Sequence, residues 1–389
     1  MAFSHRQLGR SLGTPSTSSA RTDPSRAGAR HSQGAQSKRT VTPLRYARRA
    51  LYVMGCVALL AGAPELRAVD LADQLNPTAK VAIDKGLAFL AANQLGDGSF
   101  NDTRGSGVVG GIAIAFMAAG HVPGEGPYGQ VTAKATQYLL NNIQSNGLVY
   151  IPESGGAPMY NHGLATLALA EIWGMTGDPR VRNAVQRAVD LICSSQNQKG
   201  GWRYQPKIGD DDLSVTVMQL MALRAARDAG INVPKEVIDA GIEYVKRCHN
   251  PKSQGKDGGF AYTPGGGSGL ARTGAGVTSL QVAGDYRSSE VQEGVEYLLT
   301  CEPVGKVKDD NAEFYWYGMY YATMGIYQAQ SIGTWGKNAW AQWYPAVVKQ
   351  LTTTQKPDGK WEGAHGLYPT AMAVVVLSIP YRYLPLYQR

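Results

Sequence analysis

The hydrophobic and polar residues of this chain follow two helical patterns that take turns. Residues 178–195 show the first pattern: Asp178 is suited to cap a helix and Pro179 to its first turn, and one face is apolar. The apolar stripe consists of Val181, Ala184, Val185, Ala188 and Ile192. Residues 162–173 show the second pattern, because they are apolar almost all round. The alternation predicts one helix that faces water and one that is enclosed on every side.

A short polar and glycine pattern joins the end of each amphipathic helix to the next apolar helix. Its polar residue returns every 50 to 53 residues, at Gln94, Gln144, Gln196, His249, Glu302 and Gln355. A Gly-x-aromatic sequence follows at Gly98, Gly200, Gly258 and Gly359, whereas Gly147 and Gly305 begin weaker copies that lack the aromatic residue. A period of this length is typical of repeat proteins. The six copies predict an all-α protein, an (α/α)6 toroid of helical hairpins with an inner ring of buried helices and an outer ring of amphipathic helices.

The Gln-x-x-x-Gly-x-Trp repeat and the alternation of helices resemble the squalene cyclase and protein prenyltransferase repeat superfamily. The resemblance covers residues 75–385, which we therefore expect to form one domain. It implies a terpenoid cyclase-type toroid whose centre receives an apolar ligand. It says less about activity, because the catalytic motifs of that superfamily are incomplete here.

The first 68 residues differ in composition from the repeats. Residues 1–49 are rich in Ser, Arg and Gly and have too few apolar residues for a core, so we expect them to be disordered. A basic cluster then leads into an apolar run at residues 50–63 and a plausible cleavage site near Ala68, which is typical of a signal peptide. The sequence thus predicts a protein that is exported to the periplasm, the cell envelope or the medium. A retained membrane anchor is the alternative.

The positive charge of the chain belongs mostly to this leader. Residues 1–68 hold 11 of the 38 Lys and Arg residues and 2 of the 30 Asp and Glu residues. The remainder therefore has 27 positive and 28 negative residues, a net charge of −1. This balance gives no support to a nucleic-acid partner. Beyond the leader, Cys193, Cys248 and Cys301 have no metal-site spacing, and we expect free thiols.

The main catalytic candidates are three consecutive acidic residues, Asp210, Asp211 and Asp212, ahead of a predicted inner helix. Clustered carboxyl groups raise one another's proton affinity, so one of them is suited to act as a general acid. The resemblance implies the same role, since cyclases protonate an alkene with an Asp-x-Asp-Asp motif, although Gly209 occupies the first position here. The alternative is an acidic helix cap. His162, at the start of the preceding inner helix, is a further candidate, with a structural hydrogen bond as the alternative.

The candidate ligand-binding residues are mostly aromatic and precede or begin the last two inner helices. They are Tyr315, Trp316, Tyr317, Tyr320, Tyr321, His365 and Tyr368. Aromatic faces stabilise a cation, as a terpene cyclase requires, but the same rings also fill a wide toroid by packing. His365 resembles the zinc-binding His of prenyltransferases, yet no Asp-x-Cys precedes it at an inner helix. We therefore expect no metal and no cofactor.

Three functions agree with these features. The first is an exported repeat protein that binds an apolar or isoprenoid-like small molecule or a peptide, with peripheral membrane contact and without full cyclase activity. The second is a terpene cyclase-like isomerase that uses an Asp general acid. The third is an enzyme that acts on polysaccharides, which rests on analogy with other (α/α)6 barrels. The sequence leaves enzymatic activity and the oligomeric state open.

Overall fold

The computed structural model describes residues 76–101, 105–151, 157–301 and 314–387. These residues belong to one compact unit, which spans Arg67–Arg389. The expectations for the leader, at residues 1–49 and 50–68, fall outside the described residues. Among the helices that are described, none combines the length and the apolar character needed to cross a membrane.

Long helices of two kinds alternate along the unit. The outer helices are α3 (Pro77–Ala92), α5 (Gly129–Asn141), α7 (Pro179–Ser195), α9 (Lys235–Arg247), α11 (Ser289–Thr300) and α13 (Thr334–Thr354). The inner helices are α4 (Ser106–Ala118), α6 (Pro158–Thr176), α8 (Leu213–Asp228), α10 (Leu270–Val282), α12 (Tyr315–Ala329) and α14 (Tyr368–Ser378). Short 3-10 helices are η2 (Lys252–Gln254), η4 (Gln330–Ile332), η5 (Ile379–Tyr381) and η6 (Pro385–Tyr387).

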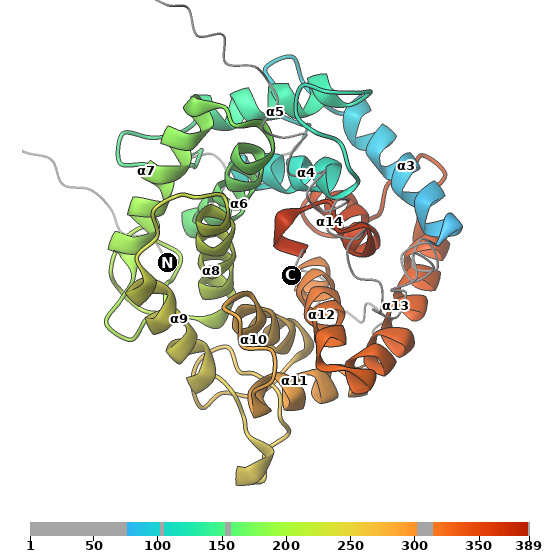
Figure 1. Cartoon of the computed structure of the whole chain (residues 1–389). Coiled ribbons are helices and arrows are strands. Elements are labelled where there is room, and N and C mark those ends of the chain that lie inside the picture. Colours follow the sequence, from blue (N-terminus) through green and yellow to red (C-terminus); the bar gives the residue numbers. More distant parts are fainter. Residues whose placement is uncertain (1–75, 102–104, 152–156, 302–313, 388–389) are drawn as a thin grey trace, which may run out of the picture. The chain divides into compact units, whose positions relative to one another are not determined.

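The inner helices close into a ring. Each packs on the next one along the chain, and α14 returns to α4 (Figure 1). The outer helices surround this ring, with α3 packed against both α13 and α14. The structure confirms the predicted (α/α)6 toroid and its two concentric layers. Within the described residues, β-bridges occur only singly, at the turns, and no strand is formed.

The burial of the two layers follows the predicted patterns. In α7 the side chain of Asp178 accepts from the Arg180 amide at 2.9 Å, and the apolar stripe that includes Val181 and Ile192 is buried. In α6, residues 162–172 are buried all round. An inner helix therefore has neighbours on every side, whereas an outer helix covers the ring with one face.

At Gln94, Gln196 and Gln355 the repeated glutamine ties its turn to the outer helix of the neighbouring unit. The Gln196 side-chain amide donates to Gly200 O at 2.9 Å and to Val237 O of α9 at 2.8 Å. Gln94 makes the same pair of contacts, with Gly98 O and Val131 O. Gly200 has φ 86°, and a Cβ atom there would collide with the backbone of Ala240 in α9. Glycine is required at this turn because only it allows this conformation and this close approach.

The weaker second copy of the turn keeps the geometry of the glycine, whereas its Gln144 side chain donates to Tyr150 O at 3.2 Å. Gly147 has φ 92° and lies against the backbone of Arg187 in α7, although it stands one residue closer to its glutamine. The fifth copy, with Glu302 and Gly305, lies outside the described residues.

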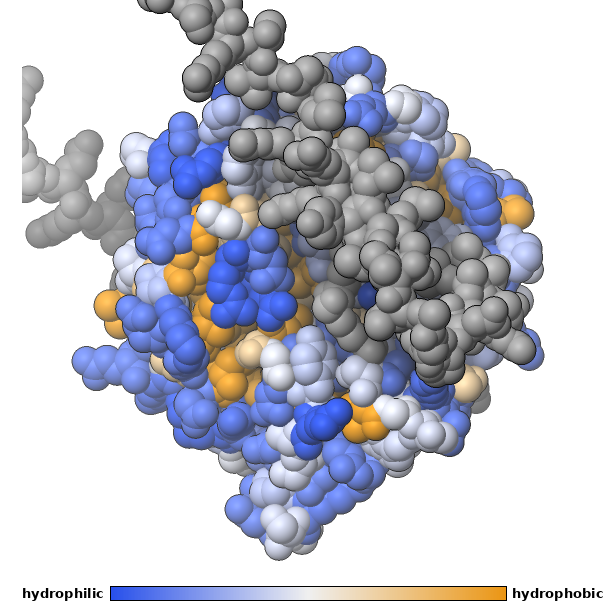
Figure 2. Space-filling view, in the orientation of Figure 1, coloured by the Kyte–Doolittle hydropathy of each residue, from blue (hydrophilic) through white to orange (hydrophobic). Residues whose placement is uncertain are grey.

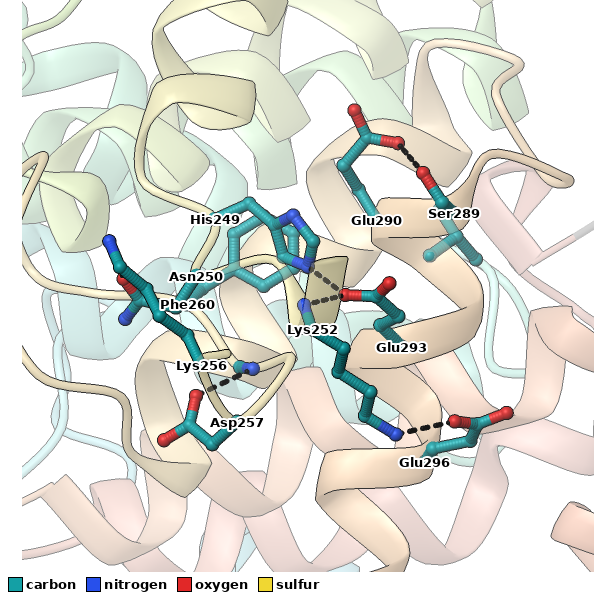
Figure 3. Close-up of polar contacts among 12 residues, drawn as sticks. His249, Asn250, Lys252, Lys256, Asp257, Phe260, Ser289, Glu290, Glu293 and Glu296 are labelled. Carbon is teal, nitrogen blue, oxygen red and sulfur yellow. Dashed lines mark hydrogen bonds and ion pairs between the residues drawn. The ribbon is translucent and has the colours of Figure 1, made fainter. Parts of the chain in front are cut away.

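In the fourth unit a histidine replaces the glutamine. His249 is buried, and its Nε2 lies 3.3 Å from a carboxylate oxygen of Glu293 in α11 (Figure 3). The Lys252 amide donates to the same carboxylate at 2.9 Å, and the Lys252 ammonium pairs with Glu296 at 2.6 Å. Burial lowers the pKa of His249, and Glu293 opposes that shift. This turn is thus joined to the next outer helix through side chains, whereas the glutamine turns use backbone carbonyls.

The last described residues lie within the ring. Leu384, Leu386 and Tyr387 are buried, and η6 packs against α6 and α8. In Figure 1 this segment follows α14 and ends near the middle of the ring, facing helices on the other side. On the face drawn in Figure 2 the rim is mostly hydrophilic, and hydrophobic residues gather nearer the middle.

Candidate functional site

The inner helices begin at the same end of the ring, where their first turns are joined by hydrogen bonds. The Gly107 amide of α4 donates to the Asn161 side chain of α6 at 2.9 Å. Tyr160 of α6 bonds to Ser214 of α8, and the Tyr317 hydroxyl of α12 donates to Ser214 O at 3.3 Å. We call this end the mouth of the ring, and it carries the candidate site.

A group of tyrosines surrounds the start of α8. The rings of Tyr160 and Tyr204 lie 5.9 Å apart, and the hydroxyls of Tyr204 and Tyr262 are 2.6 Å apart. The rings of Tyr317 and Tyr321 meet edge to face at 4.7 Å. We call these five residues the tyrosine cluster. Tyr160, Tyr204 and Tyr262 are half-buried and the other two are buried, so the cluster runs from the surface of the mouth inward.

Asp212 is the acidic residue that lies within this cluster. It is fully buried and caps α8, since its Oδ1 accepts from the Val215 amide at 2.9 Å and from the Ser214 hydroxyl at 2.6 Å. Its Oδ2 has no hydrogen-bond partner among the described residues. The helix N-terminus and the two donors stabilise the negative charge of the carboxylate.

The electrostatic effect of Asp212 reaches the tyrosines. Burial and the nearby Asp212 raise the pKa of Tyr160, despite the hydrogen bond to Ser214. Burial is also the main cause of the raised pKa of Tyr317, where Tyr321, Tyr160 and Asp212 add to it. The phenols are therefore neutral hydroxyl groups at physiological pH.

The other two residues of the acidic triplet lie elsewhere. Asp211 accepts from the Asn197 side chain at 2.7 Å and lies 3.8 Å from the Lys199 ammonium, which holds the turn before α8 together. Asp210 is exposed. The structure thus separates the three carboxylates, and only Asp212 takes part in the tyrosine cluster.

His162 is fully enclosed between backbone groups. Its Nδ1 accepts from the Val149 amide at 3.1 Å, and Nε2 lies 3.2 Å from Ala188 O of α7. Burial lowers the pKa of His162 to about 4, which keeps the ring neutral. Both ring nitrogens contact backbone groups, so His162 joins α6 to the preceding turn and to α7.

The aromatic residues of α12 point in different directions. Tyr317 and Tyr321 join the tyrosine cluster, whereas the Tyr315 hydroxyl accepts from Gln350 of the outer helix α13 at 2.9 Å. Trp316 is buried and packs edge to face on Tyr315. Tyr320 lies deeper in the ring, where it influences the pKa of Tyr387 and of Tyr368.

The two remaining sequence candidates precede or begin α14. Tyr368 is half-buried and contributes to the raised pKa of Tyr317 and of Tyr321, so it lies beside the tyrosine cluster. His365 is half-buried in the preceding loop and has φ 82°. In the described parts of the chain, no three His, Cys, Asp or Glu side chains gather closely enough to hold a metal ion.

Several residues of the site were missed by the sequence analysis: Tyr160, Arg203, Tyr204, Ser214 and Tyr262. A signal for two of them was present, because a tyrosine follows two residues after the aromatic residue in both Gly-Gly-Trp-Arg-Tyr and Gly-Gly-Phe-Ala-Tyr. The repeat places Tyr204 and Tyr262 at equivalent positions of neighbouring units, and their hydroxyls meet.

Arg203 supplies a cation next to these rings. Its guanidinium lies 4.9 Å from the centre of the Tyr204 ring and 5.9 Å from that of Tyr262. The carboxylates of Asp212 and Asp210 both act on it. Arg203 therefore brings a positive charge and N–H donors to the edge of the tyrosine cluster.

A second buried carboxyl group lies deeper in the ring. Glu171 of α6 is 2% exposed, and burial raises its pKa to about 8, although a hydrogen bond with the Leu386 backbone opposes the shift. Its neighbours Tyr320 and Tyr387 are buried as well. Glu171 is therefore mostly protonated at neutral pH. It lies beside η6 and not at the mouth.

No protein-family model and no curated protein sequence matches this chain. Solved structures resemble its fold. A type II terpene cyclase from Scytonema in complex with its substrate geranylgeranyl dihydroxybenzoate has 14% identity and a TM-score of 0.54, over 80% of this chain and 100% of that one. A cellobiose 2-epimerase from Spirochaeta thermophila has 12% identity and a TM-score of 0.58, over 82% and 98%.

An inactive variant of an α-1,6-mannanase from Salegentibacter, in complex with α-1,6-mannotetrose, has 6% identity and a TM-score of 0.59, over 78% of this chain and 98% of that one. These likenesses show the fold, an (α/α)6 toroid, and this fold hosts several chemistries.

Proposed function

We propose that this protein binds an isoprenoid-like small molecule at the mouth of the ring, with the apolar chain against the tyrosine cluster and the polar end near Tyr160 and Ser214. The observation that carries the proposal is the cluster itself. Aromatic rings from different inner helices meet around one buried carboxylate, and they run from half-buried positions inward. Ligand sites are commonly apolar and aromatic, with a few placed polar groups.

An apolar chain suits this arrangement better than a peptide does. The half-buried rings of Tyr160 and Tyr204 offer apolar surface, whereas a peptide needs paired donors and acceptors for its backbone. The substrate of the similar terpene cyclase, which carries a geranylgeranyl chain, is consistent with such a ligand.

We do not extend the proposal to cyclase chemistry. The contacts of Asp212 that the structure shows are those of an acceptor, since its Oδ1 accepts from Ser214 and from the Val215 amide. These contacts use the carboxylate as an acceptor that orders its neighbours.

Binding of geranylgeraniol to the purified protein, followed by native mass spectrometry and thermal shift, tests the proposal. We expect Tyr204→Ala to weaken binding at least about tenfold, because it removes a half-buried ring that packs on Tyr160. Tyr128→Ala is the matched control, since Tyr128 is also half-buried and packs on His121 at 4.8 Å, in the layer of α4 and α5.

Equal loss in both variants, or no binding by the wild-type protein, would contradict the proposal. Binding of mannotetraose in place of geranylgeraniol would favour the polysaccharide function instead.

A further inference from the structure

In the hydrogen bonds at the mouth, it can be worked out which hydroxyl group donates and which oxygen accepts. The Ser214 hydroxyl has one proton, and it donates this proton to the carboxylate of Asp212 at 2.6 Å. In the bond between Tyr160 and Ser214, the serine oxygen must therefore accept and the Tyr160 hydroxyl must donate. The proton of Tyr160 is thus used inside the protein.

Tyr317 is in the same state. Its hydroxyl donates to the backbone carbonyl of Ser214 at 3.3 Å. Each phenol has one proton, so what Tyr160 and Tyr317 retain for a ligand is the lone pairs of the phenolic oxygen. The Oδ2 atom of Asp212 also has no hydrogen-bond partner among the described residues, but it is buried. The half-buried Tyr160 therefore presents its phenolic oxygen as an acceptor.

The charge of Asp212 acts in the same sense, because it reaches Tyr160. The N–H donors of Arg203 lie beside the rings of Tyr204 and Tyr262. A diphosphate next to Tyr160 would have no proton to donate to the phenolic oxygen and would lie near the buried carboxylate of Asp212. A hydroxyl group, by contrast, donates a proton and adds no charge.

We propose that the polar end of the ligand is a hydroxyl group that donates a hydrogen bond to the phenolic oxygen of Tyr160, with Asp212 and Ser214 as the positioning residues that fix its direction. This inference rests on the proposed isoprenoid binding and specifies its head group. It assigns a neutral alcohol, rather than a diphosphate, as the class of ligand.

Three probes with the same chain test the inference: geranylgeraniol, its methyl ether and geranylgeranyl diphosphate. The ether keeps the oxygen and loses the donor. We expect the alcohol to bind about tenfold more tightly than the ether, the usual effect of one hydrogen bond, and the diphosphate to bind more weakly than the alcohol. Dissociation constants are measured by calorimetry in detergent below its micelle concentration.

Tyr160→Phe should remove the difference between alcohol and ether. Tyr297→Phe is the control, because Tyr297 is a half-buried tyrosine of the outer helix α11, and it should keep the difference.

The outcomes separate the two proposals. If none of the probes binds, the proposed function fails. If the ether or the diphosphate binds as tightly as the alcohol, or Tyr160→Phe keeps the difference, isoprenoid binding stands and the assignment of the head group is overturned.

Discussion

The role of a single residue depends on its neighbours in the fold, and His162 is an example. Its ring is enclosed, and both nitrogens contact backbone groups of other segments. Because burial disfavours the charged ring, the folded protein takes up this proton near pH 4, whereas an unfolded chain does so near pH 6.5. The folded state is therefore fully favoured above pH 6.5 and loses stability as the pH falls towards 4.

This difference in pKa predicts an acid-dependent loss of about 3 kcal/mol in the free energy of unfolding. In His162→Gln that part of the pH dependence should be absent, although the variant should be less stable at pH 7.5 by about 2 kcal/mol because the buried Val149 amide loses its acceptor. Urea unfolding at a series of pH values from 4 to 7.5 measures both effects. An unchanged slope in the variant would assign the acid sensitivity to other groups.

The acidic triplet shows why sequence alone does not identify the residue at a site. Asp210, Asp211 and Asp212 have the same chemistry and stand side by side in the sequence. In the structure Asp212 has extended backbone, paired with Trp202, and successive side chains of extended backbone point to opposite sides. Asp211 therefore contacts Asn197 while Asp212 turns into the cluster. The alternative of an acidic cap describes Asp212, and its place among tyrosines required the fold.

At the scale of elements, the turn between an outer and an inner helix carries the repeat. Its glycine combines a positive φ with close contact to the next outer helix, as Gly200 shows against Ala240. Gly177 also has a positive φ, 66°, at the end of α6, but a Cβ atom there would meet nothing within 4 Å. A side chain at Gly177 would cause backbone strain alone, whereas a side chain at Gly200 would cause both strain and a collision.

Gly200→Ala should therefore lower the free energy of unfolding by more than about 3 kcal/mol, whereas Gly177→Ala should cost about 1 kcal/mol. Chemical denaturation of both variants measures the comparison. Similar losses in the two would mean that the turn adjusts and that strain alone matters.

The sequence predicted the helices and their layers well, and it predicted the direction of individual side chains least well. The two periodicities gave the helices and their layers, since an amphipathic stripe and a fully apolar helix are buried differently. A helix that is apolar all round has no periodic signal for the direction of its side chains. For α12 the sequence therefore named Tyr315 and Tyr317 alike, yet one contacts α13 and the other the start of α8.

At the scale of the whole molecule, the ring closes through one copy of the repeated contact. The Gln355 side chain donates to Ala82 O of α3 at 2.9 Å and to Gly359 O at 2.9 Å. Gln196 makes the equivalent contacts with α9 in the middle of the chain. Helix α3 follows no other described helix, so it relies on this closure more than α9 relies on Gln196.

Gln355→Ala should accordingly raise amide exchange in α3 about fivefold, the effect of losing a bond worth roughly 1 kcal/mol, with little change in α9. Gln196→Ala should leave α3 as protected as in the wild-type protein. Hydrogen exchange followed by mass spectrometry resolves the two helices. Faster exchange throughout the molecule in both variants would show that the ring opens as one cooperative unit.

The contact between Gln355 and Ala82 joins residues 273 positions apart. A ribosome adds about 5 to 20 residues each second, so α3 waits on the order of 15 to 50 seconds before its partner has been synthesised. During that interval the apolar face of α3, which includes Ile83, Leu87 and Leu90, has no ring to cover it. A closed toroid of this kind therefore leaves the apolar face of its first described helix uncovered for longer than an open array of the same repeats would.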